Sequence, residues 1–452
     1  MKKHYYFIGI GGIGMSGIAK LLLRSGQKVS GSDLKESEIT RELKLLGANI
    51  FIGHKAQNLN SVDCIVYSSA ISEDNPEMIE AKKRHLPILK RAEALAGLMQ
   101  EKTVITIAGS HGKTTTASLA SLLLLEAGLS PTVAVGGILQ NIDTNASLGK
   151  GDFFVAEADE SDGSFLYYQP RYSIVTNIDF EHLDFYKEFS NELAAFKEFI
   201  NKTEDGGCIF ACKDDTNLQS ILKGCDKRHL FFGLDASADI YPKDIVINGL
   251  TSEFICCLRD KDIGRFHLAL GGRHNISNSL AVIALGLELG IDLKMIQGTL
   301  ASYKGSRRRL QVKHSGDYIL IDDYAHHPTE ISATLQAIKN LNPKRIIALF
   351  QPHRYSRTKL LLGEFSNSFG LADYLIITDI YPAGEKNIEG ISSKSIYDNI
   401  KLCFPDKELY CLAKEELVPR VLGIIRPGDL VITLGAGDIT KVSDELAERF
   451  KG

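Results

Sequence analysis

The sequence lacks several features that would assign it to other classes of protein. No apolar stretch reaches the roughly 18 consecutive residues that a membrane-spanning helix needs. Charge of neither sign dominates, because 52 lysines and arginines oppose 56 aspartates and glutamates for a formal net charge of −4. A broad basic surface for nucleic acid is therefore excluded, and the chain has neither low-complexity tracts nor repeats of solenoid period. We expect no nucleic-acid partner and no membrane contact.

Cysteine is present, but not in a pattern that binds metal. Eight cysteines are scattered along the chain. Cys208 and Cys212 come nearest to a ligand pair, yet no second pair stands at zinc spacing, and Cys256 and Cys257 are adjacent. We therefore expect reduced, buried thiols in a cytoplasmic protein. The apolar run near the N-terminus is interrupted by glycines, so we expect no export signal.

The order of apolar segments predicts three α/β domains. A chain of 452 residues is too long for one ordinary core, and its length suggests about three domains. Short apolar runs typical of strands alternate with helical patterns, which favours parallel sheets with crossover helices. In the third domain we expect four strands, at "DYILIDD", "RIIALFQ", "DYLIITD" and "DLVITLG". We expect domains of residues 1–99, 100–308 and 309–452, with a β insertion at about residues 225–270 of the second.

A glycine turn in the second domain has the pattern of a phosphate-binding loop. The apolar run "TVITIAG" is followed by "SHGKTTTASLA", which reads as a strand, a turn and the start of a helix. Gly109 and Gly112 permit a tight backbone whose N–H groups converge on an anion, while Lys113 would reach the β- and γ-phosphates and Thr114 would bind Mg²⁺. Ile107 stands where the usual eight-residue motif has its first glycine, so this loop is a compact variant. The alternative is an ordinary helix start capped by glycine.

Carboxylates follow the next buried strand, as a nucleotide-bound metal requires. The segment "FFVAEADESDGSF" offers Glu157, Asp159, Glu160 and Asp162. We choose Glu157 as the Mg²⁺ ligand, because the metal-binding acid of a nucleotide enzyme usually lies just past such a strand. The alternative is a solvated acidic loop.

A third polar cluster stands after a further strand. The segment "TNIDFEHLDFY" contains Asn177, Asp179 and His182. Ligands of α/β sheets bind beyond the carboxyl ends of the strands, and this strand is expected to neighbour the phosphate loop. A second metal site at His182 is therefore plausible, although a lone histidine is usually structural.

The first glycine turn of the chain matches a dinucleotide fingerprint. Gly9, Gly11 and Gly14 fit G-x-G-x-x-G between a strand and a helix, and Asp33 follows the second strand. The pattern recognises only a diphosphate and a ribose, so it fits a nicotinamide coenzyme and a nucleotide sugar alike. The phosphate loop favours the nucleotide sugar, because hydride transfer needs no ATP.

Eight motifs in one order carry a resemblance to a known family. They are "GIGGIGMSG", "GSHGKTTT", "EADESDGSF", "NIDFEHLD", "GRHNISNSLA", "GSRRRLQ", "DDYAHHPTE" and "FQPHRYSRT". Together they cover essentially the whole chain, which resembles the Mur ligases. The resemblance implies a Rossmann-like UDP-sugar domain, a central P-loop ATPase-like domain with a β insertion, and a C-terminal Rossmann-like domain for the amino acid.

Site residues are implied by the same resemblance, motif by motif. For ATP they are Gly109, Ser110, His111, Gly112, Lys113, Thr114, Thr115, Asn275, Asn278, Arg308 and Asp323. For the UDP sugar they are Gly11, Gly12, Ile13, Gly14, Asp33 and Ser69. The implied metal ligands are Thr114, Glu157 and His182, and the implied catalytic residues are Lys113, Glu157, His182 and His326.

At two positions the sequence departs from the family pattern on which these site assignments are based. Tyr303 and Leu310 stand where the family usually has phenylalanine. Many Mur ligases also carry a carbamylated lysine on the helix after the motif histidine. Lys197 is the only nearby candidate for that lysine, and we leave that role unassigned.

The implied reaction joins L-alanine to UDP-N-acetylmuramate for peptidoglycan precursor synthesis, with ATP and Mg²⁺. ATP would convert the carboxylate to an acyl phosphate, the amine would attack it, and ADP and phosphate would leave. Catalysis would then consist of positioning and of neutralising phosphate oxygens.

The third domain would supply the amine's base and the clamp for its carboxylate. His326, His327 and His353 are candidates for the base, and the alternative for the histidine pair is a surface cap on the helix that Pro328 begins. The planar forks of two arginines in "PHRYSRT" suit a carboxylate. By resemblance the alanine pocket contains His326, Arg354 and Arg357.

Three other functions remain to be distinguished. A ligase that adds a tripeptide to the same UDP sugar is the rival within the family, and "PHRYSRT" argues against it. An NAD-dependent dehydrogenase is the rival from another class. A hydrolase is disfavoured because Ser16 lacks the context of a nucleophile elbow. We expect a monomer or homodimer.

Overall fold

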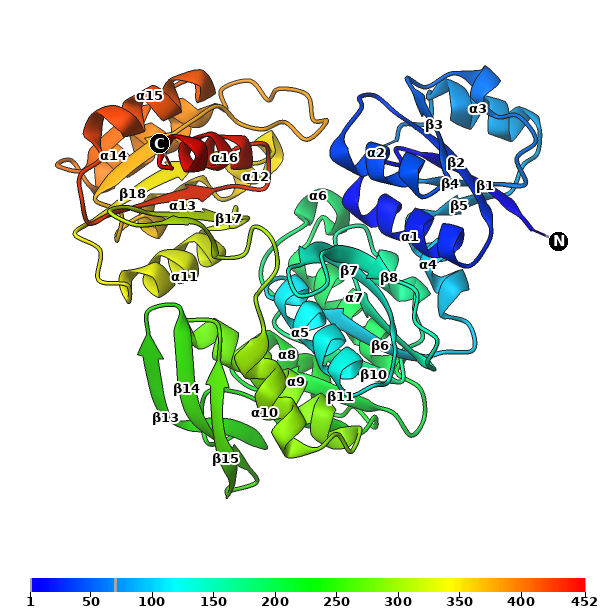
Figure 1. Ribbon diagram of the computed structural model, residues 1–452, viewed down its shortest axis with the longest axis horizontal. Helices are drawn as coiled ribbons and strands as arrows, with labels where there is room; N and C mark the ends of the chain where they lie inside the picture. The colour runs from blue at the N-terminus through cyan, green and yellow to red at the C-terminus, as the bar shows by residue number, and fades with distance from the viewer. Residues whose placement is uncertain (1, 69–70, 452) are drawn as a thin grey trace. The chain divides into compact units, whose positions relative to one another are not determined.

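The computed structural model describes residues 2–68 and 71–451, which form three β-sheets whose strands alternate with helices along the chain (Figure 1). This confirms the fold class predicted from the sequence. The chain divides into two compact units. The first comprises Met1–Lys243, Ile255–Gly264 and Ser277–Tyr303, and the second comprises Asp244–Phe254, Arg265–Ile276 and Lys304–Gly452.

The N-terminal sheet is parallel, with strand order β3-β2-β1-β4-β5. That order is the one found in dinucleotide-binding sheets, where ligands bind at the point where the order reverses beside β1. Its strands are β1 (His4–Ile8), β2 (Lys28–Asp33), β3 (Asn49–Ile52), β4 (Cys64–Tyr67) and β5 (Ile88–Lys90). Its helices are α1 (Ile13–Arg24), α2 (Glu38–Leu45), η1 (Ala56–Asn58), α3 (Pro76–Lys83) and α4 (Arg91–Met99).

Local signals explain where these helices begin. Ser37 and Thr40 form a reciprocal cap at the start of α2. Asn75 caps α3, and Pro76 occupies its first turn, where the missing N–H costs nothing. The first helix differs, because Gly12 precedes α1 with no side-chain cap and leaves the N-terminal N–H groups of that helix available for an anion.

The central sheet has strand order β15-β14-β13-β12-β11-β10-β6-β9-β7-β8. Its first seven strands along the chain are β6 (Thr103–Ala108), β7 (Thr132–Leu139), β8 (Thr144–Ser147), β9 (Phe153–Glu157), β10 (Tyr172–Val175), β11 (Cys208–Cys212) and β12 (His229–Phe232). Strand β6 is parallel to both β9 and β10, so the residues that follow these three strands meet at one edge.

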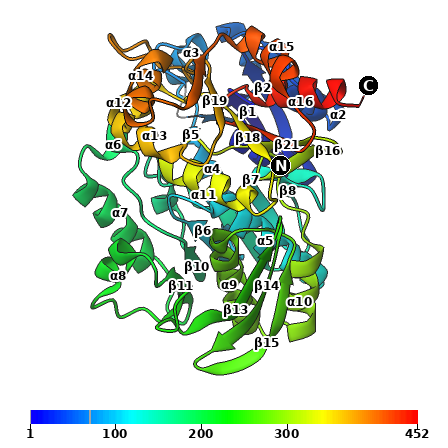
Figure 2. The ribbon, with the colours of Figure 1, turned by 90° about the vertical axis from the view of Figure 1, so that its left-hand side faces the viewer.

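Helices and a three-stranded extension complete this region. The helices are α5 (Lys113–Glu126), η2 (Ser164–Tyr167), α6 (Leu183–Tyr186), α7 (Phe189–Asn201), α8 (Thr216–Leu222), α9 (Arg273–Glu288) and α10 (Leu293–Ser302). The extension consists of β13 (Ile240–Asn248), β14 (Thr251–Leu258) and β15 (Lys261–Leu268), which Figure 2 shows as neighbouring strands. The predicted β insertion is therefore present but begins later than expected, because β12 still pairs in parallel with β11.

The β7–β8 hairpin connects the two sheets of the first unit. Asn145 on β8 donates from Nδ2 to the carbonyl of Ile13 at 2.8 Å and accepts from Lys20 Nζ at 3.2 Å. Arg24 Nη1 donates to the carbonyl of Ala146 at 3.2 Å. Helix α1 is thus tied at its first residue and along its length to the β7–β8 hairpin.

The C-terminal sheet has strand order β16-β17-β21-β18-β19-β20, with β16 antiparallel to β17 and the rest parallel. Its strands are β16 (Gln311–Ser315), β17 (Ile319–Asp323), β18 (Arg345–Phe350), β19 (Tyr374–Ile377), β20 (Glu408–Cys411) and β21 (Asp429–Leu434). Its helices are α11 (Pro328–Lys339), α12 (Tyr355–Leu360), α13 (Leu362–Ser368), α14 (Ser393–Cys403), α15 (Lys414–Ile424) and α16 (Thr440–Arg449).

Four of these strands were expected and two were not. The apolar runs predict β17, β18, β19 and β21, which are buried between two hydrophobic clusters. The sequence analysis missed β16 and β20, because edge strands are covered less completely and "QVKHS" and "ELYC" carry polar residues. No helix among the described residues has both the length and the apolar content to cross a membrane.

Candidate functional site

The turn between β6 and α5 has the backbone of a phosphate loop. Gly109 and Gly112 have φ of +125° and +84°, a region that side chains other than glycine rarely adopt. A Cβ on Gly109 would lie 2.2 Å from Thr176 Oγ1, and one on Gly112 would lie 2.7 Å from Asn278 Oδ1. Both glycines are therefore required by conformation and by space, and Asn278 lies against the loop.

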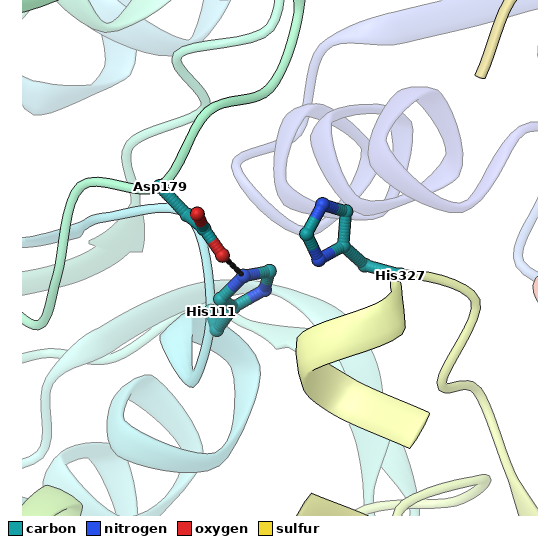
Figure 3. A group of neighbouring side chains, drawn as sticks. All are labelled: His111, Asp179 and His327. Atoms are coloured by element: carbon teal, nitrogen blue, oxygen red, sulfur yellow. Dashed lines mark hydrogen bonds and ion pairs between the residues drawn. The ribbon is translucent and has the colours of Figure 1, made fainter. Parts of the chain in front are cut away.

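The segment after β10 holds this loop in place. Ser110 N and His111 N donate to the main-chain and side-chain oxygens of Asn177, at 3.0 and 2.8 Å. His111 Nε2 lies 2.9 Å from Asp179 Oδ2 (Figure 3). The sequence analysis expected Asn177 and Asp179 beside the loop, and the structure brings them there.

Lys113 is the first residue of α5 and is largely buried. Its Nζ lies 2.5 Å from the carbonyl oxygen of Gly109, 3.1 Å from that of Ser110 and 2.8 Å from Glu160 Oε1. Burial alone would lower the pKa of Lys113, but the charges of Glu160 and Asp159 outweigh it and raise the pKa. A full positive charge is thereby held at the place where a γ-phosphate would enter.

Thr114 and Glu157 contact each other next to Lys113 and could together hold a cation. Thr114 Oγ1 lies 3.2 Å from Glu157 Oε2, and Glu157 Oε1 accepts from Gly136 N at 2.6 Å. A hydroxyl and a carboxylate beside a phosphate suit Mg²⁺, which binds few protein ligands and keeps waters and phosphate oxygens. These two residues fit the metal role that the resemblance implies.

A second group that could hold a cation consists of Glu160, Glu181 and His182. Their ligand atoms all lie within 4.8 Å of one another. His182 Nε2 is 3.4 Å from Glu160 Oε1 and 3.6 Å from Glu181 Oε2. Glu160 Oε2 is buried and has no hydrogen-bond partner among the described residues. An orphaned carboxylate oxygen beside a histidine and a second carboxylate fits a hard divalent cation such as Mg²⁺ or Mn²⁺.

The sequence analysis named His182 for this place and offered Glu160 among the acids near the phosphate loop, but it chose Glu157 as the metal ligand and did not single out Glu181. The two carboxylates also set the charge of the histidine. Burial would lower the pKa of His182, but hydrogen bonding to Glu160 and the charge of Glu181 raise it. The usable signal was the proximity of two carboxylates in "EADESDGSF" and "FEHLD" at the ends of β9 and β10.

Glu192 on α7 is a further buried acid near this group. Its side chain is fully buried, and neither carboxylate oxygen has a hydrogen-bond partner among the described residues. Burial raises the pKa of Glu192 to about 8, with Glu160 and Glu181 adding to the effect and His182 opposing it. Lys197, on the same helix, is exposed. The buried ionisable group of this helix is therefore a carboxyl.

The N-terminal glycine turn presents the start of α1, with Asp33 bound to it. Gly11 N donates to Asp33 Oδ2 at 2.8 Å, and a Cβ on Gly11 would lie 2.8 Å from the same oxygen. The carboxylate predicted to bind ribose therefore already holds the turn. Gly12 is the N-cap of α1 and Ile13 is its first residue, while Ser69 lies outside the described residues.

Gly14, the third glycine of the fingerprint, makes room for an arginine. A Cβ on Gly14 would lie 3.2 Å from Arg91 Nη1. Arg91 Nη2 in turn lies 3.2 Å from Asp159 Oδ2. Burial would raise the pKa of Asp159, but Arg91 and Lys113 lower it to about 2. The sequence analysis did not single out Arg91.

Arg308 and Asp323 of the second unit are engaged within that unit. Arg308 Nη2 donates to the carbonyl of Gly435 at 2.5 Å. Asp323 accepts from Leu310 N at 2.6 Å and from Ala325 N at 2.8 Å, and burial raises its pKa to about 6. The two residues therefore shape their own loops, and their contact with ATP remains a prediction.

Asn275 and Thr115 complete the predicted ATP set. Asn275 is buried and donates from Nδ2 to the carbonyl of Gly271 at 2.8 Å. Thr115 is buried in the first turn of α5, where its carbonyl lies 3.5 Å from the hydroxyl of Tyr303. Tyr303, one of the two departures from the family pattern, thus packs against the helix that follows the phosphate loop.

The predicted alanine residues gather around His353. The rings of His326 and His353 lie edge to face with centroids 5.6 Å apart, and Arg357 Nη1 is 3.2 Å from His353 Nδ1. Burial lowers the pKa of His353 to about 2, helped by the charges of His326, Arg357 and Arg354. A neutral His353 accepts from Arg357 and orients it, so His353 is a poor base.

The two histidines before α11 have different partners. His326 Nδ1 lies 3.0 Å from the carbonyl of Tyr324, which places the ring hydrogen on Nδ1 and the lone pair on Nε2. His327 accepts from Thr329 N and caps α11, but its side chain is buried and not on the surface as the alternative expected. Arg354 precedes α12 with φ of +70°, a strained backbone for an arginine.

Comparisons with known proteins show the family to which the chain is similar. Models of the Mur ligase family catalytic domain, the Mur ligase middle domain and the Mur ligase glutamate ligase domain match residues 4–103, 107–286 and 308–437. The chain is 48% identical over 448 residues to the UDP-N-acetylmuramate–L-alanine ligase of Geotalea uraniireducens, which covers 99% of this chain and 98% of that protein.

Two solved structures are also similar. The UDP-N-acetylmuramate-alanine ligase of Thermotoga maritima matches with a TM-score of 0.84 and 30% identity, over 99% of both chains. The UDP-N-acetylmuramate:L-alanyl-γ-D-glutamyl-meso-diaminopimelate ligase of Neisseria meningitides matches with a TM-score of 0.63 and 29% identity, over 68% of this chain and all of that one.

Proposed function

This chain belongs to the Mur ligase family of ATP-dependent, amide-forming ligases, and from that premise we propose that it joins L-alanine to the carboxylate of UDP-N-acetylmuramate. The product would be a precursor of peptidoglycan, made in the cytoplasm where ATP is available. We assign residues 1–99 to the UDP sugar, 100–308 to ATP and 309–452 to the amino acid.

One observation carries the proposal most directly. The ammonium of Lys113 lies in a phosphate loop, 2.8 Å from Glu160, with the Thr114–Glu157 pair and the Glu160–Glu181–His182 group next to it. A loop with two cation sites is suited to transferring a phosphoryl group, since such reactions depend on neutralising phosphate oxygens. Relatives that are similar over nearly the whole chain are named as ligases of UDP-N-acetylmuramate and alanine.

The chemistry begins with the activation of a poor electrophile. The carboxylate of the UDP sugar attacks the γ-phosphorus of ATP, the bond to the β-phosphate oxygen breaks, and an acyl phosphate and ADP result. Lys113 exchanges its contacts with the loop carbonyls for the γ-phosphate oxygens and neutralises their growing charge. Mg²⁺, when bound by Thr114 and Glu157 and by Glu160, Glu181 and His182, supplies further neutralisation of the phosphates.

The second half of the reaction forms the amide. The neutral amine of alanine attacks the acyl carbon, and the tetrahedral intermediate expels phosphate. His326 would take the amine proton at Nε2, because its Nδ1 faces the carbonyl of Tyr324. Arg357, oriented by His353, would bind the carboxylate of the amino acid together with Arg354.

The tripeptide-adding ligase is the rival that needs a direct test, because its relative also acts on UDP-N-acetylmuramate. We would incubate the protein with ATP, Mg²⁺ and UDP-N-acetylmuramate and measure phosphate release with L-alanine or with L-alanyl-γ-D-glutamyl-meso-diaminopimelate. We expect release with alanine and little with the tripeptide. Release that is faster with the tripeptide, or that needs no amine, would refute the assignment. An absorbance change with NADH would support a dehydrogenase instead.

A further inference from the structure

Arg91 lies between the two glycine turns of the first unit. It is the first residue of α4, a helix that contacts both α1 and the η2 turn after the acidic loop. Its guanidinium approaches the backbone of Gly14, with Nη1 3.2 Å from the place of a Cβ there. On its other side Nη2 lies 3.2 Å from Asp159.

The guanidinium retains most of its donors for another partner. An arginine has five N–H donors in a planar fork. Among the described residues, the Arg91 side chain makes one hydrogen bond, to Asp159. Its side chain is 23% exposed, so solvent or a ligand can reach it. Asp159 therefore fixes the orientation of Arg91 and leaves further donors available.

The arginine and Lys113 are held by adjacent acids. Asp159 holds Arg91 at 3.2 Å, and the next residue, Glu160, holds Lys113 at 2.8 Å. One cation thus faces the N-terminus of α1, and the other lies in the phosphate loop. Arg91 therefore lies against the turn of α1 on one side and against the acidic segment that holds Lys113 on the other.

The proposed sugar substrate would reach from the first glycine turn to the second. Its diphosphate suits the N-terminus of α1, and its carboxylate must meet the γ-phosphate near Lys113. The carboxylate then lies between those two places, close to other anions that repel it. A planar guanidinium matches a carboxylate with two parallel hydrogen bonds and offsets that repulsion.

We propose that Arg91 binds the carboxylate of the UDP sugar and positions it for attack on the γ-phosphate, a role that rests on the proposed function. The third glycine of the fingerprint then has a specific purpose in this chain. It keeps the space beside α1 open for the guanidinium of Arg91.

The test compares three uridine ligands in the absence of ATP. UDP and UDP-N-acetylglucosamine carry the diphosphate but no carboxylate, whereas UDP-N-acetylmuramate carries both. By titration calorimetry, Arg91→Met should lower the affinity for UDP-N-acetylmuramate about 10- to 100-fold. The same substitution should change the other two affinities by less than about threefold, while Arg91→Lys should keep part of the affinity for the muramate.

A matched control separates this role from simple packing between the two sheets. Arg24→Met removes a different arginine contact between the same sheets, from Arg24 Nη1 to the carbonyl of Ala146. The affinities of this variant for the three uridine ligands should stay within about threefold of the wild-type values. In turnover, Arg91→Met should raise KM for the muramate and lower kcat, with KM for ATP unchanged.

The failing outcomes are distinct. If Arg91→Met lowers the affinities for all three ligands equally, Arg91 acts on the diphosphate or in packing, and the proposal is overturned. An unchanged affinity for UDP-N-acetylmuramate would also overturn it. If the wild-type protein releases no phosphate with UDP-N-acetylmuramate and alanine, the proposed function itself fails. If the wild-type protein is active but Arg91→Met lowers the three affinities equally, the role of Arg91 is overturned and the proposed function stands.

Discussion

Replacing Lys113 should abolish turnover without affecting the binding of the UDP sugar, and it should lower the stability of the protein because a buried ion pair is broken. In Lys113→Met, Glu160 loses the cation 2.8 Å away while remaining fully buried. Breaking a buried ion pair by removing one partner costs about 3–5 kcal/mol of unfolding free energy. For a domain of this size, 1 kcal/mol shifts Tm by about 2–4 °C, so we expect Tm to fall by roughly 6–20 °C.

A second substitution tests the cause of that loss. In Lys113→Met with Glu160→Gln, no uncompensated charge remains, so Tm should recover in part. Activity should not recover, because removing one group that stabilises transition-state charge already costs about 10²- to 10³-fold in kcat. Affinity for UDP-N-acetylmuramate should stay near the wild-type value in both variants, since the sugar is assigned to the other turn.

Scanning fluorimetry, phosphate release and titration calorimetry measure these three quantities. Lys102→Met is the matched control, because Lys102 lies at the boundary before β6 and its Nζ donates to the carbonyl of Gly151 without an ion pair. It should leave Tm, turnover and sugar affinity nearly unchanged. If Glu160→Gln fails to restore any stability to Lys113→Met, the buried-charge argument is wrong. If Lys113→Met abolishes sugar binding, the two glycine turns have been assigned to the wrong ligands.

Four further predictions test neighbouring features. Glu157→Gln should raise the Mg²⁺ concentration needed for half-maximal turnover about 10-fold or more, without changing sugar affinity in calorimetry. Gly109→Ala should abolish ATP binding by calorimetry, because the Cβ would lie 2.2 Å from Thr176 Oγ1. The raised pKa of Glu192 means that the folded protein holds a proton that the unfolded chain releases, so metal-free Tm should fall as pH rises from about 5 to 8 and Glu192→Gln should flatten that fall. His353→Ala should raise KM for alanine at constant KM for ATP, because Arg357 loses its partner; an unchanged alanine KM would contradict the orienting role.

The sequence predicted the elements that depend on local rules. The phosphate loop was recognisable because Gly109 and Gly112 need positive φ and stand between a buried strand and a helix. The four inner strands of the C-terminal sheet were recognisable because both of their faces are buried. Edge strands such as β16 and β20 were missed, since partial burial gives no clear apolar run.

The site residues that the sequence analysis missed depend on side chains meeting across elements. Glu157, the predicted metal ligand, ends β9 and Glu160 follows it, but only the fold shows that Glu157 contacts Thr114 and that Glu160 contacts Lys113. Glu192 lies on a helix where a carboxyl would ordinarily face water, so its burial could not be anticipated. Arg91 carried no motif at all, because its partners Gly14 and Asp159 are distant in the chain.

The β7–β8 hairpin has a consequence for how the first unit responds to its ligands. Its second strand holds the carbonyl of Ile13 through Asn145, and its first strand holds Glu157 through Gly136 N. The hairpin therefore contacts the first residue of α1 through one strand and the carboxylate of Glu157 through the other. If α1 shifts when a nucleotide sugar binds, we expect these two hydrogen bonds to carry part of the shift to Glu157.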